Sequence, residues 1–459
     1  MNFLARFFKF QEHGTNLRTE IIAGITTFVT MAYILFLNPN ILSATGMDKN
    51  AVFFATAVAA GVVSIAMGLV ANFPIALAPG MGLNAFFAAI AVQGHGMPWQ
   101  VALGAVFLSG IVFVILTVTK VRQLLVVAVP ASLKVAITVG IGLFITIIGL
   151  KLSGIMAVKA AVIPSTLEAL NSNGGVSNLL FFEWNIGLGS LASADVLLCL
   201  IGLAITAALM VKRVKGSLLI GIVVATIIGI PMGVTRIGDG FTPFSLPDLS
   251  NLYVGALDIK GALSMGILTV IFTFTFVELF DTFGTLVGTA SKAGLIDKDG
   301  KSPSIGKAML VDAFGVSFGA FMGTSTVTAY VESAAGIGEG GRTGMTAVTT
   351  GIFFLLALVL APLALIIPSA ATAPALIIVG LLMVSAIKEI DFEDFTEGLP
   401  AFMTFVMMPF TYSIANGIAA GIIFYVFLKA TTGKYKSVHW LMYVLFALVV
   451  IRYAFLLGE

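Results

Sequence analysis

Three acidic residues lie inside apolar sequence, where carboxylates are unusual. Glu278 and Asp281 occur in FTFTFVELFDTFGTLVG, and Glu332 follows alternating Thr and Val in GTSTVTAYVESAAGIG. Because Glu278 and Asp281 are three residues apart, a helix would place them on the same face. Such carboxylates usually face a cavity, where they accept hydrogen bonds or carry a proton. The alternative is that neighbouring hydroxyls simply satisfy them.

Asn84 is a fourth candidate, because it directly follows a run broken by Pro79, Gly80 and Gly82 in LAPGMGLNAFFA. Its amide can both donate and accept, although a lone intramembrane Asn more commonly joins helix to helix. Its place after a broken segment favours a ligand. Four phenylalanines could cover the faces of a flat ligand or simply pack: Phe86, Phe87, Phe274 and Phe276.

The composition indicates a polytopic membrane protein. Of the 459 residues, 59% are hydrophobic and 10% charged, whereas soluble domains carry roughly 25% charge. The apolar runs repeatedly reach the ~20 residues that cross about 30 Å of hydrocarbon. We predict fourteen segments, at residues 20–42, 51–71, 75–93, 98–119, 131–150, 190–211, 216–232, 261–289, 306–322, 324–337, 343–367, 373–387, 399–411 and 414–429.

The basic residues predict the orientation. With the N-terminus inside, eighteen of the 24 Lys and Arg residues fall in cytoplasmic connections, five fall outside and Arg452 is unassigned. We therefore expect a cell-membrane protein with both ends of the bundle in the cytoplasm. The last apolar run, residues 440–457, is equally compatible with a surface helix and an extra span.

The third and tenth segments are irregular and lie seven segments apart. Ile75 to Ala78 and Ser325 to Tyr330 have strand character, and strands at membrane depth would have to pair with each other. Broken segments at equivalent places in two halves predict an inverted-repeat transporter with its site at the midplane. The alternative is ordinary helix packing, in which Gly and Pro are also common.

Several other functions are disfavoured. A net charge of +2 gives no footprint for nucleic acid. One cysteine, Cys199, and three histidines far apart in sequence predict no disulfide framework, no metal site and no cofactor. We expect Cys199 to pack, and Asp195 and Asp312, near segment ends, to be interfacial or capping residues.

The candidate residues together form an acceptor-rich site, which disfavours anions. A heterocycle with several N–H groups, or a cation, would suit it. Several carboxylates close together in a low dielectric would not all ionise, so one could carry a coupling proton.

Five stretches closely resemble the AzgA-like purine permeases of the nucleobase:cation symporter-2 family: LAPGMGLNAFFA, FVELFDTFGTLVG, SKAGLID, GTSTVTAYVESAAGIGEGGRTG and PAFMTFVMMPFTYSIANGIA. The resemblance implies the UraA-like fold, with two inverted sevens and short antiparallel strands in segments 3 and 10. It implies a core domain, 1–130 and 261–370, that moves against a gate domain, 131–260 and 371–459.

The resemblance also implies uptake of hypoxanthine, guanine or adenine with a proton. It makes Glu332 and Glu278 purine ligands, lets Asn84 line the pocket, and gives Asp281 a coupling or supporting role. Some relatives lack an acidic residue at the position of Glu278, which indicates that Glu278 helps to determine which purine is bound. The resemblance implies a homodimer paired through the gate domain. The Gln-His pair of the nucleobase-ascorbate branch is absent, which disfavours xanthine and uric acid.

Other readings remain open at this point. Another cargo such as uracil or xanthine could use the same fold, and an ungated channel would need no carboxylate. An intramembrane enzyme could use paired carboxylates to activate water, but it would need no second broken segment.

Overall fold

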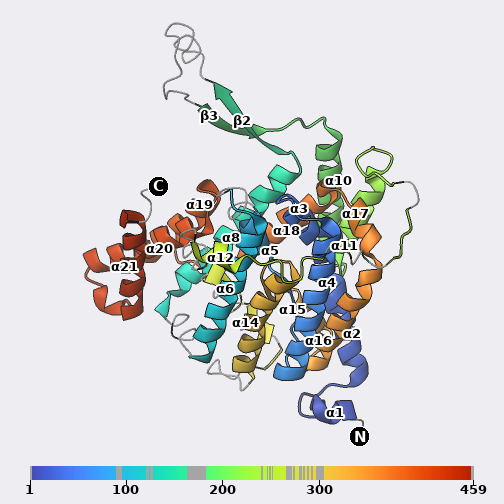
Figure 1. Cartoon of the computed structure of the whole chain (residues 1–459). Helices are drawn as coiled ribbons and strands as arrows, with labels where there is room; N and C mark the ends of the chain where they lie inside the picture. The colour runs from blue at the N-terminus through green and yellow to red at the C-terminus, as the bar shows by residue number, and fades with distance from the viewer. Residues whose placement is uncertain are drawn as a thin grey trace.

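The computed structural model describes residues 3–88, 96–119, 124, 128–162, 182–238, 241–245, 247, 250, 252–264, 271, 274–275, 277–278, 282, 285–286, 289–290, 293–295 and 304–455. Over these residues the chain is a helical bundle with two two-stranded sheets (Figure 1). Eight of the described helices, some running through a short break or turn, are long and apolar enough to cross a membrane. The polytopic class is confirmed, whereas the count of fourteen segments stays a prediction.

The first half of the chain contains α1 (Phe3–Phe7), α2 (Leu17–Met31), α3 (Ile34–Ser43), α4 (Lys49–Ala66), η1 (Met67–Ala71), β1 (Leu77–Pro79), α5 (Met81–Phe86), α6 (Trp99–Val118), α8 (Ala131–Leu152), β2 (Met156–Val162), β3 (Phe182–Leu188), α10 (Ala194–Val211) and α11 (Ser217–Gly229). The second half contains α12 (Ile259–Ser264), α14 (Ile305–Met322), β4 (Val327–Ala329), α15 (Ser333–Gly338), α16 (Gly344–Leu356), η3 (Ala357–Val359), α17 (Ala361–Ile366), α18 (Ser369–Val384), η4 (Ser385–Glu389), α19 (Phe395–Phe410), α20 (Ile414–Thr431), η5 (Tyr435–Ser437) and α21 (Trp440–Phe455).

Polar residues directly before the apolar runs begin several of these helices. The side chains of Asn16, Asp48 and Ser193 accept a backbone N–H from the first turns of α2, α4 and α10. Each cap satisfies an N–H group that the helix leaves unpaired. Asp195 lies in the first turn of α10, as expected, and Cys199 is buried in the same helix.

The packing of the first half is repeated in the second. Helix α4 packs on α16 and α14 packs on α6; α10 packs on α18 and α19 packs on α8; α10 packs on α11 and α19 packs on α20. In each of these three comparisons, moving both helices of the first pair by seven predicted segments along the chain gives the second pair. The helix contacts therefore follow the repeat that the two broken segments predict.

These contacts form two groups of helices. Helices α2, α3, α4, α6, α14, α15 and α16 pack around β1 and β4, and α5, which continues directly from β1, belongs with them. Helices α8, α10, α11, α18, α19 and α20 pack on one another. Small residues permit the closest approaches: a Cβ at Gly380 on α18 would lie 2.5 Å from the carbonyl oxygen of Gly142 on α8. Such close backbone contact is typical of membrane helices.

Among the described residues, a small number of helix pairs join the two groups. On α5, a Cβ at Gly82 would lie 2.5 Å from Ile141 Cγ2 on α8. Lys215, between α10 and α11, forms an ion pair with Glu339, which directly follows α15. Helix α2 also contacts α11, and α3 contacts α18.

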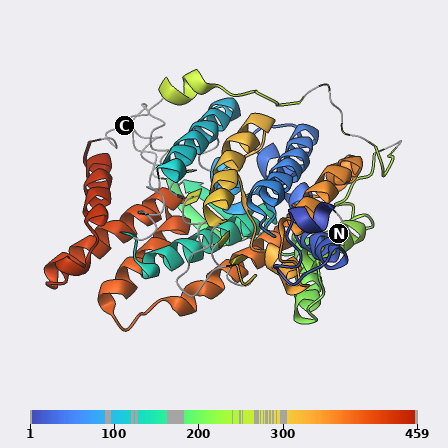
Figure 2. The same ribbon diagram turned by 90° about the horizontal axis from the view of Figure 1, so that it is seen from below.

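Two features differ from the sequence prediction. The segment expected at residues 20–42 is two helices, α2 and α3, separated by a turn at Ala32 and Tyr33. The connection after α8 contains an antiparallel hairpin of β2 and β3, which projects from the bundle at the end opposite α1 (Figure 1). Helix α21 is continuous, packs on α20 and lies at one edge of the bundle in both views (Figures 1 and 2).

Candidate functional site

Strands β1 and β4 pair at the centre of the first group of helices, as the sequence predicts. They are antiparallel, with Leu77 opposite Ala329 and Pro79 opposite Val327. The N–H of Gly80 donates to the carbonyl of Thr326 at 2.9 Å and extends the pairing beyond the strands. Because each strand leads into a short helix, α5 and α15, the backbone at this depth stays hydrogen-bonded while it changes direction.

Glu332 lies directly before α15, at the end of the β4 segment. It is partly buried, and its Oε1 accepts a 2.6 Å hydrogen bond from the hydroxyl of Tyr33. Tyr33 is fully buried in the turn between α2 and α3. The sequence prediction missed Tyr33; the signal was a phenol inside the apolar run MAYILF, because a buried Tyr hydroxyl usually has a partner.

Glu278 is fully buried on a helical stretch whose described residues fall between 271 and 290. Its Oε1 accepts from the hydroxyl of Thr282 at 3.1 Å, and Thr282 lies 2.8 Å from the hydroxyl of Thr328 on β4. The structure therefore connects Glu278 to the strand that precedes Glu332.

Asn84 lies on α5 and is fully buried. Its Oδ1 accepts from the hydroxyl of Ser325, which directly precedes the β4 segment, at 2.5 Å. Its Nδ2 has no hydrogen-bond partner among the described residues. A buried amide donor without a partner is costly, so this group is suited to donate to a ligand.

The aromatic candidates are only partly covered by the described residues. Phe86 on α5 meets Phe274 edge to face, with ring centroids 4.9 Å apart and planes at 74°. This contact joins α5 to the stretch that carries Glu278. Asp281 and Phe276 lie outside the described residues.

Asp312 corrects the sequence prediction. It was expected near a segment end, but it lies inside α14 and is fully buried. Its Oδ1 accepts from the backbone N–H of Ala329 at 3.1 Å and from the hydroxyl of Thr328 at 3.3 Å. The periodicity of an isolated segment could not reveal this partner, because β4 reaches Asp312 only after the chain has folded back.

The β1 strand has a corresponding support on α4. The hydroxyl of Ser64 donates to the carbonyl of Leu77 at 3.0 Å and accepts from its N–H at 2.9 Å. Each strand is thus fastened by a buried side chain of the helix that precedes it. The two supports differ in chemistry, because one is a neutral hydroxyl and the other a carboxylic acid.

Glu20 positions the segment that follows α15. It is fully buried on α2 and accepts from the backbone N–H groups of Arg342, Thr343 and Thr346. A carboxylate at these N–H groups satisfies the start of α16 and is favoured by the helix dipole. Glu20 therefore fixes the backbone between α15 and α16, which follows Glu332. We assign Glu20 a structural role.

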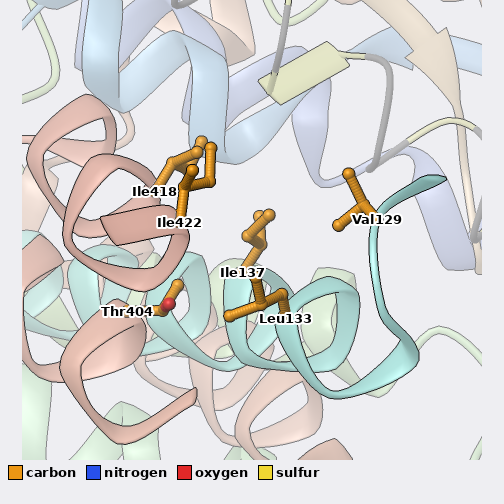
Figure 3. A pocket seen from close by; sticks show the side chains of 6 residues that line it. All are labelled: Val129, Leu133, Ile137, Thr404, Ile418 and Ile422. Atoms are coloured by element: carbon orange, nitrogen blue, oxygen red, sulfur yellow. The ribbon is translucent and has the colours of Figure 1, made fainter. Parts of the chain in front are cut away.

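A small pocket lies elsewhere, between α8, α19 and α20 (Figure 3). It is apolar and contains none of the predicted site residues. Its lining consists of Val129, Leu133, Ile137, Thr404, Ile418 and Ile422. The hydroxyl of Thr404 already donates to Pro400, so the pocket offers little to a polar ligand.

The residues around β4 are mostly hydrogen-bond acceptors. Asn84 is joined to the start of the segment, Glu278 to its middle through Thr282 and Thr328, and Glu332 lies at its end. No group of three His, Cys, Asp or Glu residues that could hold a metal occurs among the residues described. The arrangement suits an uncharged ligand with several N–H donors.

A family model described as "Permease family" matches residues 18–420 of the chain. The chain is 44% identical to the adenine permease AdeP of Escherichia coli over 453 residues, which cover 99% of this chain and 96% of that protein. It is also 44% identical to the guanine/hypoxanthine permease PbuG of Bacillus subtilis over 462 residues, with 98% and 99% covered.

The fold is similar to that of the transmembrane domain of the cyanobacterial bicarbonate transporter BicA. The TM-score is 0.62 at 17% identity, and the match covers 88% of this chain and 97% of that one. At this identity the likeness concerns the fold alone.

Proposed function

Because the chain belongs to this permease family and is a multi-pass membrane protein, we propose that it imports purine nucleobases together with a proton. The proposed cargo is hypoxanthine or guanine, with adenine as the alternative. In this proposal the buried carboxylates bind the purine or carry the coupling proton, so no cleavage chemistry is needed to explain them.

The observation that carries the proposal is the set of hydrogen-bond acceptors placed along the β4 segment. Glu332 offers a carboxylate whose described side-chain donor is only the Tyr33 hydroxyl. Asn84 offers an N–H for a ring nitrogen or carbonyl of the purine, and Phe86 offers an aromatic face. The oxopurines suit this site because they carry an additional ring N–H for a facing carboxylate.

The proposed movement is that of a core against a gate. The proposed core is residues 1–130 and 261–370 and the proposed gate is 131–260 and 371–459; the two groups of helices follow this division except that α18 begins at Ser369. Among the described residues, few helix pairs join the two groups, which supports a rigid-body movement of one against the other. Residues 440–455 belong to the gate side, because α21 packs on α20.

The proposed location is the cell membrane, with both ends of the bundle in the cytoplasm. The excess of Lys and Arg in alternate connections supports this orientation. Helix α1 and the β2–β3 hairpin then lie on opposite sides of the membrane (Figure 1). We also propose that two copies pair through the gate.

The test is uptake into proteoliposomes. Labelled adenine, guanine, hypoxanthine, xanthine and uracil are offered under separate inward gradients of H⁺ and Na⁺. We expect saturable accumulation of purines under the H⁺ gradient, with hypoxanthine and guanine preferred. Accumulation driven by Na⁺ alone would overturn proton coupling, and preference for uracil or xanthine would overturn the assigned cargo.

A further inference from the structure

A continuous hydrogen-bond chain joins two carboxyl groups that lie on different segments. Glu278 Oε1 is 3.1 Å from the Thr282 hydroxyl, which is 2.8 Å from the Thr328 hydroxyl, which is 3.3 Å from Asp312 Oδ1. The exposed fraction is 2% or less for each of the four residues. These four side chains are therefore shielded from bulk water in this conformation.

The number of hydrogen atoms decides how many protons these hydrogen bonds require. Three links need three hydrogens, and each threonine hydroxyl supplies one. With both carboxyl groups ionised, one of the three links would join two lone pairs and would be repulsive. A single additional proton, on either Glu278 or Asp312, completes all three links. The geometry thus fits one proton for two carboxyl groups.

The other half of the molecule shows that fastening a strand does not require an acid. Ser64 holds β1 with a hydroxyl, whereas Asp312 holds β4 with a carboxyl group. A buried carboxyl group in a membrane protein is expensive and usually functional. Asp312 therefore has a use beyond the support of β4.

The charged surroundings of Asp312 are simple over the elements that are fully described. Helices α4 and α6 and strands β1 and β4 pack against α14. Lys49 is the charged residue on them, at the start of α4, and Lys307 lies on α14 itself. Glu278 is the acidic group to which the hydrogen-bond chain connects Asp312.

We propose that Glu278 and Asp312 share the coupling proton through Thr282 and Thr328. With the proton on Asp312, hydrogen bonds run from Asp312 to Thr328, to Thr282 and to Glu278. When the proton moves to Glu278, three O–H bonds break, three form and the direction of every link reverses, so no proton is gained or lost. Thr328 lies on β4, and Glu332, the proposed ligand of the purine, follows directly after the β4 segment. The position of the proton is therefore linked to the segment that binds the purine.

This inference rests on the proposed function, and its test separates the two. Proteoliposomes with wild-type protein, Thr282→Val or Thr328→Val are assayed with labelled hypoxanthine and adenine in two modes. Counterflow without a proton gradient measures binding and reorientation, and accumulation under an inward proton gradient measures coupling. We expect both variants to retain counterflow but to lose accumulation by about tenfold, a size typical of coupling between two sites.

Two further variants control for packing. Thr275→Val removes a buried hydroxyl whose one hydrogen bond among the described residues is to the carbonyl of Ile271, one turn earlier, at 2.8 Å, so this variant should behave as wild type. Thr282→Ser keeps the hydroxyl and should restore accumulation. Folding is checked by size-exclusion chromatography and thermal unfolding.

The outcomes are distinct. Wild-type accumulation in Thr282→Val and Thr328→Val would overturn the shared proton while the proposed function stands. Loss of counterflow and accumulation together in folded variants would also overturn it, because the hydroxyls would then serve binding. Failure of wild-type protein to exchange any purine would instead overturn the proposed function.

Discussion

At the scale of single residues, Glu332 is less buried than Glu278 and Asp312, the other described acids near β4. It is only partly buried, and its Oε1 already accepts one hydrogen bond, from Tyr33. In the proposed site, a purine N–H would bind Glu332 without breaking any of the hydrogen bonds described for β4. Asp312, in contrast, is bound to β4 itself, so its loss would disturb the backbone as well as the chemistry.

Two replacements of Glu332 should distinguish the effect of its negative charge from the effect of its ability to accept a hydrogen bond. Glu332→Ala should weaken purine binding by at least about tenfold, since a hydrogen bond to a charged group contributes about 1.5–3 kcal/mol. Glu332→Gln should retain part of the affinity, because the amide oxygen still accepts. The measurement is the purine-dependent thermal shift of each purified variant. Unchanged affinity in Glu332→Ala would remove Glu332 from the site.

At the scale of elements, the two short strands are the features that the sequence predicted best. Alternating Thr and Val before Glu332, and Pro and Gly after Ala78, are local signals, and the requirement for paired backbone in the membrane joins them. Tyr33 and Asp312 were missed because their importance depends on partners about 300 and 17 residues away. The β2–β3 hairpin was missed because its connection was classified by charge and not by strand pattern.

The support of β1 by Ser64 can be tested directly. Ser64→Ala leaves the buried N–H and carbonyl of Leu77 without this hydroxyl, so we expect a loss of about 1–3 kcal/mol of stability. Ser109→Ala is the matched control, because Ser109 is also buried and its hydroxyl, among the described residues, donates to the carbonyl of Val106 in its own helix. Thermal unfolding in detergent compares the two. Equal destabilisation by both changes would show that the strand support is energetically unimportant.

At the scale of the whole molecule, the proposed transport cycle needs the two groups of helices to slide past each other. Gly82 on α5 and Ile141 on α8 form one of the close contacts between them. A glycine at this position keeps the surface of α5 flat against α8. Bulk added there should therefore hinder movement more than it hinders folding of either group.

A pair of substitutions tests this contact. Gly82→Ala should slow purine counterflow by roughly fivefold or more, because overpacking typically costs about 1–3 kcal/mol. Adding Ile141→Ala makes room for the new methyl group and should restore the rate towards wild type. Purine-dependent thermal shift monitors binding in parallel. Failure of the double variant to recover would mean that Gly82 acts on the binding site and not on the movement.

The ion pair between Lys215 and Glu339 also bridges the two groups, and its side chains are 55% and 31% exposed. An exposed pair of this kind contributes at most about 1 kcal/mol and weakens as salt rises. An interaction of this size is too weak to hold the protein in one conformation. It is large enough to change the rate of the proposed core movement by up to about fivefold. If the core moves against the gate as proposed, the Lys215–Glu339 pair has to open in each cycle, and this step should become faster as the ionic strength of the surrounding solution rises.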